Sequence, residues 1–212
     1  MKSYGQLCAV ARALDVVGDR WTLLVVRELL IQGPLRFGEL QRGLPGIATN
    51  LLTQRLRDLE EQGVLSRTDG DRAAGPALYR LTARGVALDG VIRELLKWGA
   101  PTVPSAPPDA VFQMHWLSRP ARYLLSDHEP DRPRTVIRFG TPADGFDLTA
   151  ASGTVTVAPC AEDARVDATV MGPGPALVAL LQGATGIDTA EEHGVTVEGD
   201  ATALARVLPR PA

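Results

Sequence analysis

The sequence predicts an α+β protein with two domains: a winged helix-turn-helix domain, then an α+β domain with a mixed sheet of about five strands. Helical apolar spacing followed by two short strand-like runs predicts the first domain, and short strands interleaved with helices predict the second. Between them, four prolines oppose a continuing helix and favour an extended spacer. We therefore expect domains at residues 1–99 and 110–212, joined by a linker at residues 100–109.

Composition limits the class of protein. The chain has 212 residues, of which 45% are hydrophobic, but no apolar run approaches the ~18 residues of a membrane helix. The first residues show no signal peptide, so we expect a cytoplasmic protein with no membrane partner. Residues 1–100 hold 14 Lys/Arg and 11 Asp/Glu, a balance of +3, whereas residues 101–212 hold 8 and 14, a balance of −6. The basic half is better suited to a polyanion.

Three helices open the first domain. Apolar residues recur at helical spacing over residues 8–17 and again over residues 21–32, where a following glycine and proline stop the second helix. Phe37 and Leu40 mark a short third helix. Trp21 and Phe37 have apolar helical neighbours, so we expect both rings in the core and not stacked on bases.

A fourth helix has two different faces. It begins at Thr49 and reaches Gln62, and Gly63 ends it. Thr49 or a neighbouring residue is the expected N-cap. At about 100° per residue, its apolar side consists of Leu52, Leu56 and Leu59. Its polar side consists of Asn50, Gln54, Arg57 and, at the edge, Thr53. Because Asn and Gln suit adenine edges and Arg suits guanine, this helix is predicted to enter a major groove of double-stranded DNA.

A hairpin and a last helix complete the first domain. Residues 64–68 and 77–82 are strand-like and flank a basic turn, which is typical of a wing. Arg36, Arg67 and Arg72 are candidate phosphate contacts, while Arg55 lies between the helix faces and can contact phosphate or pair with nearby Glu residues. The full set of expected DNA contacts is Arg36, Thr49, Asn50, Thr53, Gln54, Arg55, Arg57, Arg67 and Arg72.

The helix over residues 83–98 carries an apolar stripe of the kind that often pairs with another chain. We expect a homodimer that forms through the first helix and the helix ending at Trp98. A winged-helix dimer binds two half-sites about one helical turn apart, which predicts a near-palindromic operator.

Motifs along the first hundred residues resemble the HxlR-type winged-helix transcriptional regulators. They include Gly18-Asp19-Arg20-Trp21, Arg36-Phe37-Gly38-Glu39-Leu40, Pro45-Gly46-Ile47, Leu52 to Glu60, Tyr79-Arg80-Leu81-Thr82 and Trp98-Gly99. The resemblance implies a DNA-binding regulator, with repression as its expected activity. Some members sense electrophiles or oxidants through a cysteine near the first helix, and Cys8 occupies the matching place. Cys8 is therefore either a redox-sensing thiol or a small structural residue.

The second half is predicted to pack helices against its sheet. The strand candidates are residues 135–139, 146–149, 154–158, 167–171 and 195–198. The helix candidates are residues 110–125, 175–182 and 201–208, the last capped by Asp200.

Residues 167–172, 176–183 and 194–200 resemble a sterol-carrier-protein-2-like (SCP2-like) domain. The resemblance implies an apolar tunnel for a hydrophobic small molecule. The candidate ligand contacts are Phe112, Trp116, Tyr123, Phe139, Leu177 and Leu181, although each of them taken singly is better explained as a core residue.

We expect no enzyme, no metal and no cofactor. His115, His128 and His193 have no metal-ligand spacing with one another or with the two cysteines, and no nucleophile or phosphate-loop motif occurs. Three hypotheses remain: a dimeric regulator that senses a hydrophobic molecule in its second domain, a regulator triggered by Cys8 with a structural second domain, and a lipid-carrier or protein-interaction module that does not bind DNA.

Overall fold

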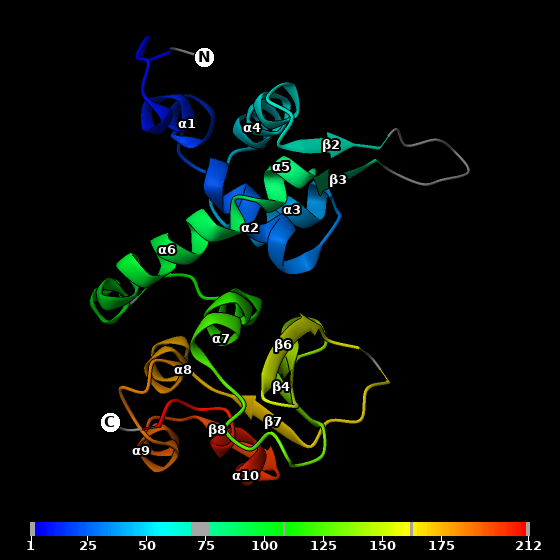
Figure 1. Cartoon of the computed structure of the whole chain (residues 1–212), viewed down its shortest axis with the longest axis vertical. Coiled ribbons are helices and arrows are strands. Elements are labelled where there is room, and N and C mark those ends of the chain that lie inside the picture. The colour runs from blue at the N-terminus through cyan, green and yellow to red at the C-terminus, as the bar shows by residue number, and fades with distance from the viewer. Residues whose placement is uncertain (1–2, 69–76, 108, 162, 211–212) are drawn as a thin grey trace. The chain divides into compact units, whose positions relative to one another are not determined.

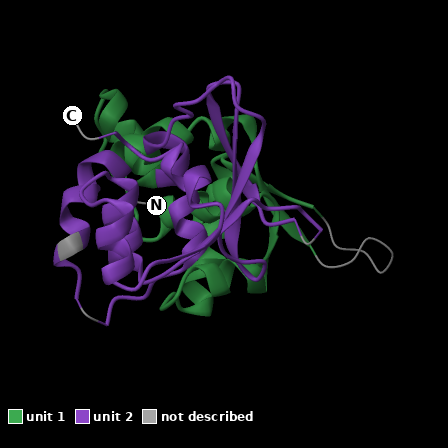
Figure 2. Ribbon diagram, turned by 90° about the horizontal axis from the view of Figure 1, so that it is seen from below, with its two compact units in different colours: residues 1–95 green, residues 96–212 purple. Residues whose placement is uncertain are grey.

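The structure is a computed structural model that describes residues 3–68, 77–107, 109–161 and 163–210. The chain divides into two compact units, Met1–Leu95 and Leu96–Ala212 (Figure 2). The division falls inside one helix, α6 (Asp89–Gly99). Among the described residues, no helix is long and apolar enough to cross a membrane.

The first unit is a helical body with a small sheet (Figure 1). Its other elements are α1 (Ala9–Val17), α2 (Thr22–Gln32), β1 (Leu35–Arg36), α3 (Phe37–Gly43), α4 (Thr49–Glu61), β2 (Leu65–Arg67), β3 (Leu78–Leu81) and α5 (Ala83–Val86). The three strands form an antiparallel sheet in the order β1-β3-β2. β1 was not predicted because two residues are too short to show a strand period.

The core of the first unit confirms the predicted faces of the fourth helix. Leu52, Leu56 and Leu59 of α4 are all buried in one apolar cluster. Trp21 and Phe37 pack against the same cluster, as expected for core side chains. The leucine face therefore fixes α4 to the body of the unit and leaves its polar face outside.

The predicted single helix over residues 83–98 is wrong, because the structure has two helices there. Thr82 caps α5 by accepting a hydrogen bond from Gly85 N at 3.2 Å. Gly85 lies so close to the chain that an added Cβ would stand 2.1 Å from Val64 O. Leu88 then packs against the core before α6 begins. Periodicity alone could not reveal this break, since tertiary contacts cause it.

The proline-rich segment is also more compact than the predicted extended spacer. Residues 100–105 form a 3-10 helix, η1 (Ala100–Ser105), with a proline in its first positions. Proline is tolerated there because the first N–H groups of a helix need no partner within it.

The second unit is built on a five-stranded mixed sheet, which confirms the predicted strand number and type. Its elements are η2 (Met114–Leu117), α7 (Ser118–Leu124), β4 (Thr135–Thr141), β5 (Asp144–Ala151), β6 (Thr154–Pro159), β7 (Ala168–Met171), α8 (Gly174–Leu181), α9 (Ile187–Glu192), β8 (Thr196–Gly199) and α10 (Ala201–Ala205). The strand order is β6-β5-β4-β7-β8; β4 and β7 pair in parallel, whereas β4 with β5, β5 with β6 and β7 with β8 pair antiparallel.

The helix predicted over residues 110–125 begins later than expected. Residues 110–113 are not helical, and the helical part starts with η2. Asp144 explains the start, because its carboxylate accepts hydrogen bonds from Met114 N at 3.1 Å and His115 N at 3.3 Å. A contact across 30 residues was not visible in a local pattern.

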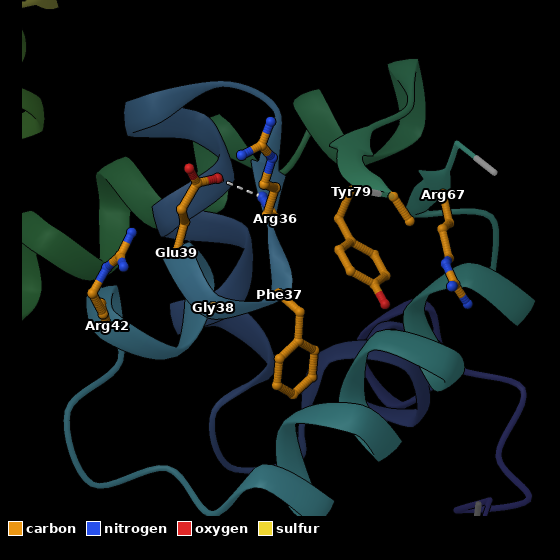
Figure 3. Close-up of a pocket in the computed structure, with 8 residues that line it drawn as sticks. Arg36, Phe37, Gly38, Glu39, Arg42, Arg67 and Tyr79 are labelled. Carbon is orange, nitrogen blue, oxygen red and sulfur yellow. Dashed lines mark hydrogen bonds between the residues drawn. The ribbon is translucent and has the colours of Figure 1, made fainter. Parts of the chain in front are cut away.

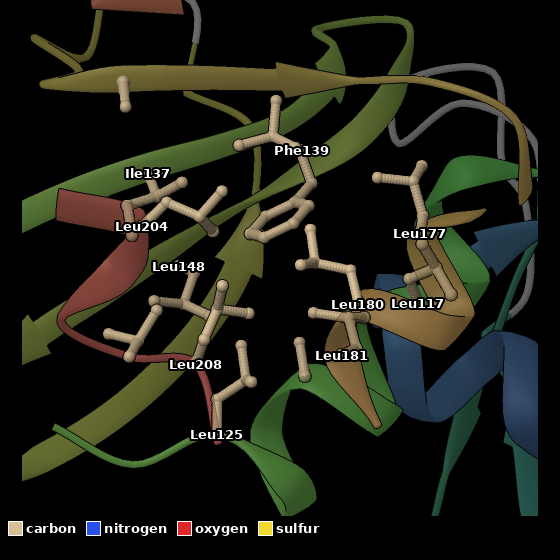
Figure 4. Packing of buried hydrophobic residues seen from close by; sticks show 14 of the residues in the cluster. Leu117, Leu125, Ile137, Phe139, Leu148, Leu177, Leu180, Leu181, Leu204 and Leu208 are labelled. Carbon is tan, nitrogen blue, oxygen red and sulfur yellow. The ribbon is translucent and has the colours of Figure 1, made fainter. Parts of the chain in front are cut away.

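Leucines of α8 pack with the sheet in a closed apolar core. Phe139 and Phe146 stack with their ring centroids 5.0 Å apart, and both are buried. Leu177, Leu180 and Leu181 of α8 belong to the same cluster (Figure 4).

Candidate nucleic-acid interface

The polar face of α4 is largely exposed. Asn50, Gln54 and Arg57 are exposed, and Thr53 is half-buried. Thr49 is the first residue of α4, and the cap position belongs to its neighbour Ala48, without a side-chain cap. The helix therefore presents the predicted polar set on one side while its leucines hold the other.

Hydrogen bonds from α3 and within α4 orient the start of this face. Gln41 of α3 donates from Nε2 to Thr49 Oγ1 at 2.9 Å. Thr53 Oγ1 donates to the Thr49 carbonyl oxygen at 2.9 Å. Both threonine hydroxyls thus have partners within the first unit.

Arg55 pairs with carboxylates in this structure. Its Nη1 donates to Asp19 of the α1–α2 corner and, at 2.8 Å, to Asp58 Oδ2. Only 15% of its side chain is exposed. Of the two roles left open by the sequence, the structure shows ion pairing, with Asp partners in place of Glu.

A basic hollow lies between the start of α3 and the wing strands (Figure 3). Its volume is about 440 Å³, and its charged lining consists of Arg36, Glu39, Arg42 and Arg67. Glu39 Oε2 accepts a hydrogen bond from Arg36 N at 2.6 Å, which fixes the entry into α3. The Arg67 guanidinium lies 5.9 Å from the centroid of the Tyr79 ring. Three arginines against one carboxylate favour an anion.

The sequence missed Arg42 and Tyr79 as members of this hollow. Neither belongs to a helix face or turn pattern that points to DNA, and only the fold brings them beside Arg36 and Arg67. Arg72, the third predicted phosphate contact, lies outside the described residues.

Comparisons with known proteins match the same part of the chain. A family model described as HxlR-like helix-turn-helix covers residues 16–106. An uncharacterized HTH-type transcriptional regulator of Synechocystis is 36% identical over 96 residues, which are 45% of this chain and 70% of that protein. The chain belongs to the HxlR-like helix-turn-helix family.

Further relatives of this HxlR-like chain are similar over the same length. An uncharacterized HTH-type regulator of Mycobacterium tuberculosis is 43% identical over 96 residues, 45% of this chain and 60% of that protein. The solved structure of the reduced form of the transcriptional regulator YodB from Bacillus subtilis is 28% identical, with a TM-score of 0.41, covering 48% of this chain and 100% of that one. The family match ends at residue 106, so it leaves the five-stranded sheet outside.

Two helices of the HxlR-like part expose apolar stripes. On and before α1 the exposed residues are Leu7, Val10 and Leu14. On α6 they are Val91, Leu95 and Trp98, of which Trp98 is 81% exposed. Val10 and Leu14 are four residues apart in α1, and Val91, Leu95 and Trp98 recur at intervals of four and three in α6, so each set shares one helix face; Leu7 lies just before α1. α1 buries only Ala11 and α6 only Ile92.

Cys8 is exposed at the N-cap of α1. The backbone N–H groups of Ala11 and Val10 lower the pKa of its thiol below the usual value. A lowered pKa increases the fraction of reactive thiolate. By contrast, burial raises the pKa of Cys160 to about 11.

The predicted ligand contacts fall into two groups in the second unit. Phe139, Leu177 and Leu181 are fully buried in the apolar cluster (Figure 4). Trp116 and Tyr123 are half-buried, and Phe112 is 37% exposed with its ring against Gly174.

Two of the histidines, His115 and His193, have a hydrogen-bonding partner in the second unit. His115 Nδ1 lies 3.1 Å from Asp144 Oδ1, and His193 Nδ1 lies 2.7 Å from the Thr189 carbonyl oxygen. In the described ranges, no three His, Cys, Asp or Glu side chains are grouped so that they could hold a metal ion.

Proposed function

We propose that this chain is a homodimeric transcriptional repressor that inserts α4 into the major groove of a near-palindromic operator. One observation carries the proposal: in an HxlR-like unit, α4 buries its leucines and exposes Asn50, Gln54 and Arg57. These side chains carry the donors and acceptors needed to distinguish base edges. These three side chains are the proposed contacts that distinguish one DNA sequence from another.

The basic hollow supplies the phosphate contacts. Arg36 and Arg67 line it from two different elements, and phosphate contacts of this kind fix the register of a protein on DNA. Arg72 belongs to the same proposed set by its place in the wing sequence. Arg55 is assigned a positioning role, because its guanidinium is already held by two carboxylates.

The apolar stripes of α1 and α6 are the proposed dimer surface. Exposed apolar faces of this kind are commonly interfaces. Dimerisation would present two copies of α4 to half-sites roughly 34–36 Å apart.

The second unit is the proposed sensor of a hydrophobic small molecule, on the strength of its SCP2-like sequence pattern and its sheet covered by helices. The ligand would contact Phe112, Trp116 and Tyr123, whose rings keep exposed surface, over the closed core containing Phe139, Leu177 and Leu181. Ligand that binds the DNA-free and DNA-bound states unequally would shift the DNA affinity.

DNA binding is tested with the region upstream of the chain's own gene. Titration by fluorescence anisotropy should show binding at least about 10³-fold tighter than to a shuffled duplex of equal length. Arg57→Ala should weaken specific binding about tenfold, whereas Arg165→Ala, an exposed arginine of the second unit, should leave it unchanged. Transcription from the bound promoter should fall when the protein is added. Equal affinity for both duplexes at low salt would contradict the proposal.

Oxidation of Cys8 is a second candidate trigger for a change in DNA binding. The exposure of Cys8 and the lowered pKa of its thiol favour this role. Oxidant or a quinone would then modify Cys8 and change DNA binding. In that case Cys8→Ser abolishes the response, while Cys160→Ser retains it because the thiol of Cys160 has a raised pKa. A Cys8→Ser protein that still responds would remove this candidate.

A further inference from the structure

Asp58 of α4 joins a base-facing side chain to the body of the first unit. Its Oδ1 accepts a hydrogen bond from Gln54 Nε2 at 2.8 Å, and its Oδ2 accepts one from Arg55 Nη1 at 2.8 Å. Arg55 also donates to Asp19 in the corner between α1 and α2. A continuous set of charge-assisted contacts therefore runs from that corner to the exposed amide of Gln54.

The chemistry of these groups decides how the Gln54 amide is turned. A carboxylate only accepts hydrogen bonds, so the NH₂ group of Gln54 must face Asp58. With one amide hydrogen committed to Asp58, the other N–H and the carbonyl oxygen remain. That pair is the one that a bidentate contact with an adenine edge requires, with N7 accepting and N6 donating.

We propose that Asp58 is a positioning residue that sets the base preference of Gln54, and that Arg55 and Asp19 hold Asp58 in place. The inference rests on the proposed DNA-binding function. An amide without this support could rotate or turn over, which would exchange its donor and acceptor. Asp58 removes that freedom before DNA arrives, so less ordering remains to be done on binding.

The position of Arg55 separates this arrangement from an ordinary pair on a helix surface. Residues four apart on an exposed helix interact weakly and stay mobile. Here 19% of the Asp58 side chain and 15% of the Arg55 side chain are exposed, and Asp19 anchors Arg55 from outside α4. Trp21, two residues after Asp19, packs against the apolar core of the unit and so connects the corner to that core.

The test is selection of binding sites from a randomised duplex library by the full chain and its variants. Wild-type protein should select a motif with two related half-sites. Gln54→Ala should lose about tenfold discrimination at one base pair in each half-site. Asp58→Ala should lose about threefold or more at that same base pair and keep the preferences elsewhere.

Two further variants make the result decisive. Glu61→Gln removes a negative charge from an exposed position of the same helix and should leave the motif unchanged. In a Gln54→Ala background, Asp58→Ala should cause no additional loss at the base pair in question. If Asp58→Ala folds poorly by thermal unfolding, the similarly shaped Asp58→Leu, which has no hydrogen-bond acceptor, takes its place, with the same base pair affected.

The possible outcomes distinguish a failure of the proposed Asp58 role from a failure of the proposed DNA-binding function. A wild-type motif that Asp58→Ala or Asp58→Leu leaves intact, or weakens evenly at every position, would overturn the role of Asp58 alone. A wild-type protein that selects no motif would overturn the proposed function, and this inference with it.

Discussion

The two units differ in what they leave for a partner. The first exposes apolar residues on α1 and on the part of α6 that ends at Leu95, and arginines around the hollow at Arg36 and Arg67. The second encloses its most buried charges: Arg206 donates from Nε to Asp127 Oδ1 at 2.7 Å and from Nη2 to Oδ2 at 2.8 Å, with neither side chain exposed. The first unit therefore carries the surfaces proposed for a second copy and for DNA, whereas the second unit pairs Arg206 and Asp127 within its own interior.

Breaking the buried pair should produce the largest effect. Asp127→Ala leaves Arg206 charged and unpaired in the interior, which should cost about 3–5 kcal/mol of unfolding free energy. Denaturant unfolding of the full chain measures the loss. Asp131→Ala, an exposed neighbour in the same loop, should behave as wild type. If both variants unfold alike, the contrast between the units disappears.

Acid should weaken the same pair. The Arg206 guanidinium holds the pKa of Asp127 well below its usual range, despite the opposing effect of burial. The depressed pKa means that the stabilising contribution is complete above the ordinary carboxyl pKa of about 4 and declines as the pH falls through the folded-state pKa. The difference in unfolding free energy between wild type and Asp127→Asn should therefore shrink on acidification. A difference that grows toward low pH would show that the linkage has the opposite sign.

Charging the apolar stripe should separate the proposed dimer. Leu95→Glu places a carboxylate on the exposed face of α6, where it would be buried between two copies. Sedimentation should show a monomer, and operator affinity should fall about 100-fold because two linked half-site contacts become one. Val111→Glu, at an exposed apolar residue of the second unit, is the control and should remain dimeric. A dimeric Leu95→Glu protein would place the interface elsewhere.

Local patterns predicted the elements with a clear period. The leucine and polar faces of α4 and five strands packed with helices followed from local patterns, whereas the mixed direction of the strands was expected together with the SCP2-like resemblance. Contacts between distant residues did not: Arg55 meets Asp19 across 36 positions, and Asp144 holds the start of η2 from 30 positions away. The break between α5 and α6 likewise depends on Gly85 lying against the chain at Val64. Such contacts are set by the packed fold, which no single window of sequence contains.

The central claim is that the first unit alone contacts DNA, and the salt dependence of operator binding tests it most directly. Combined replacement of the three proposed phosphate contacts, Arg36, Arg67 and Arg72, by alanine should reduce the slope of log affinity against log salt by about 2 to 3, since each lost phosphate contact removes about 0.9. Replacement of Arg122, Arg134 and Arg165, three exposed arginines of the second unit, should leave the slope unchanged. An equal or larger reduction from the second-unit variant would contradict the account.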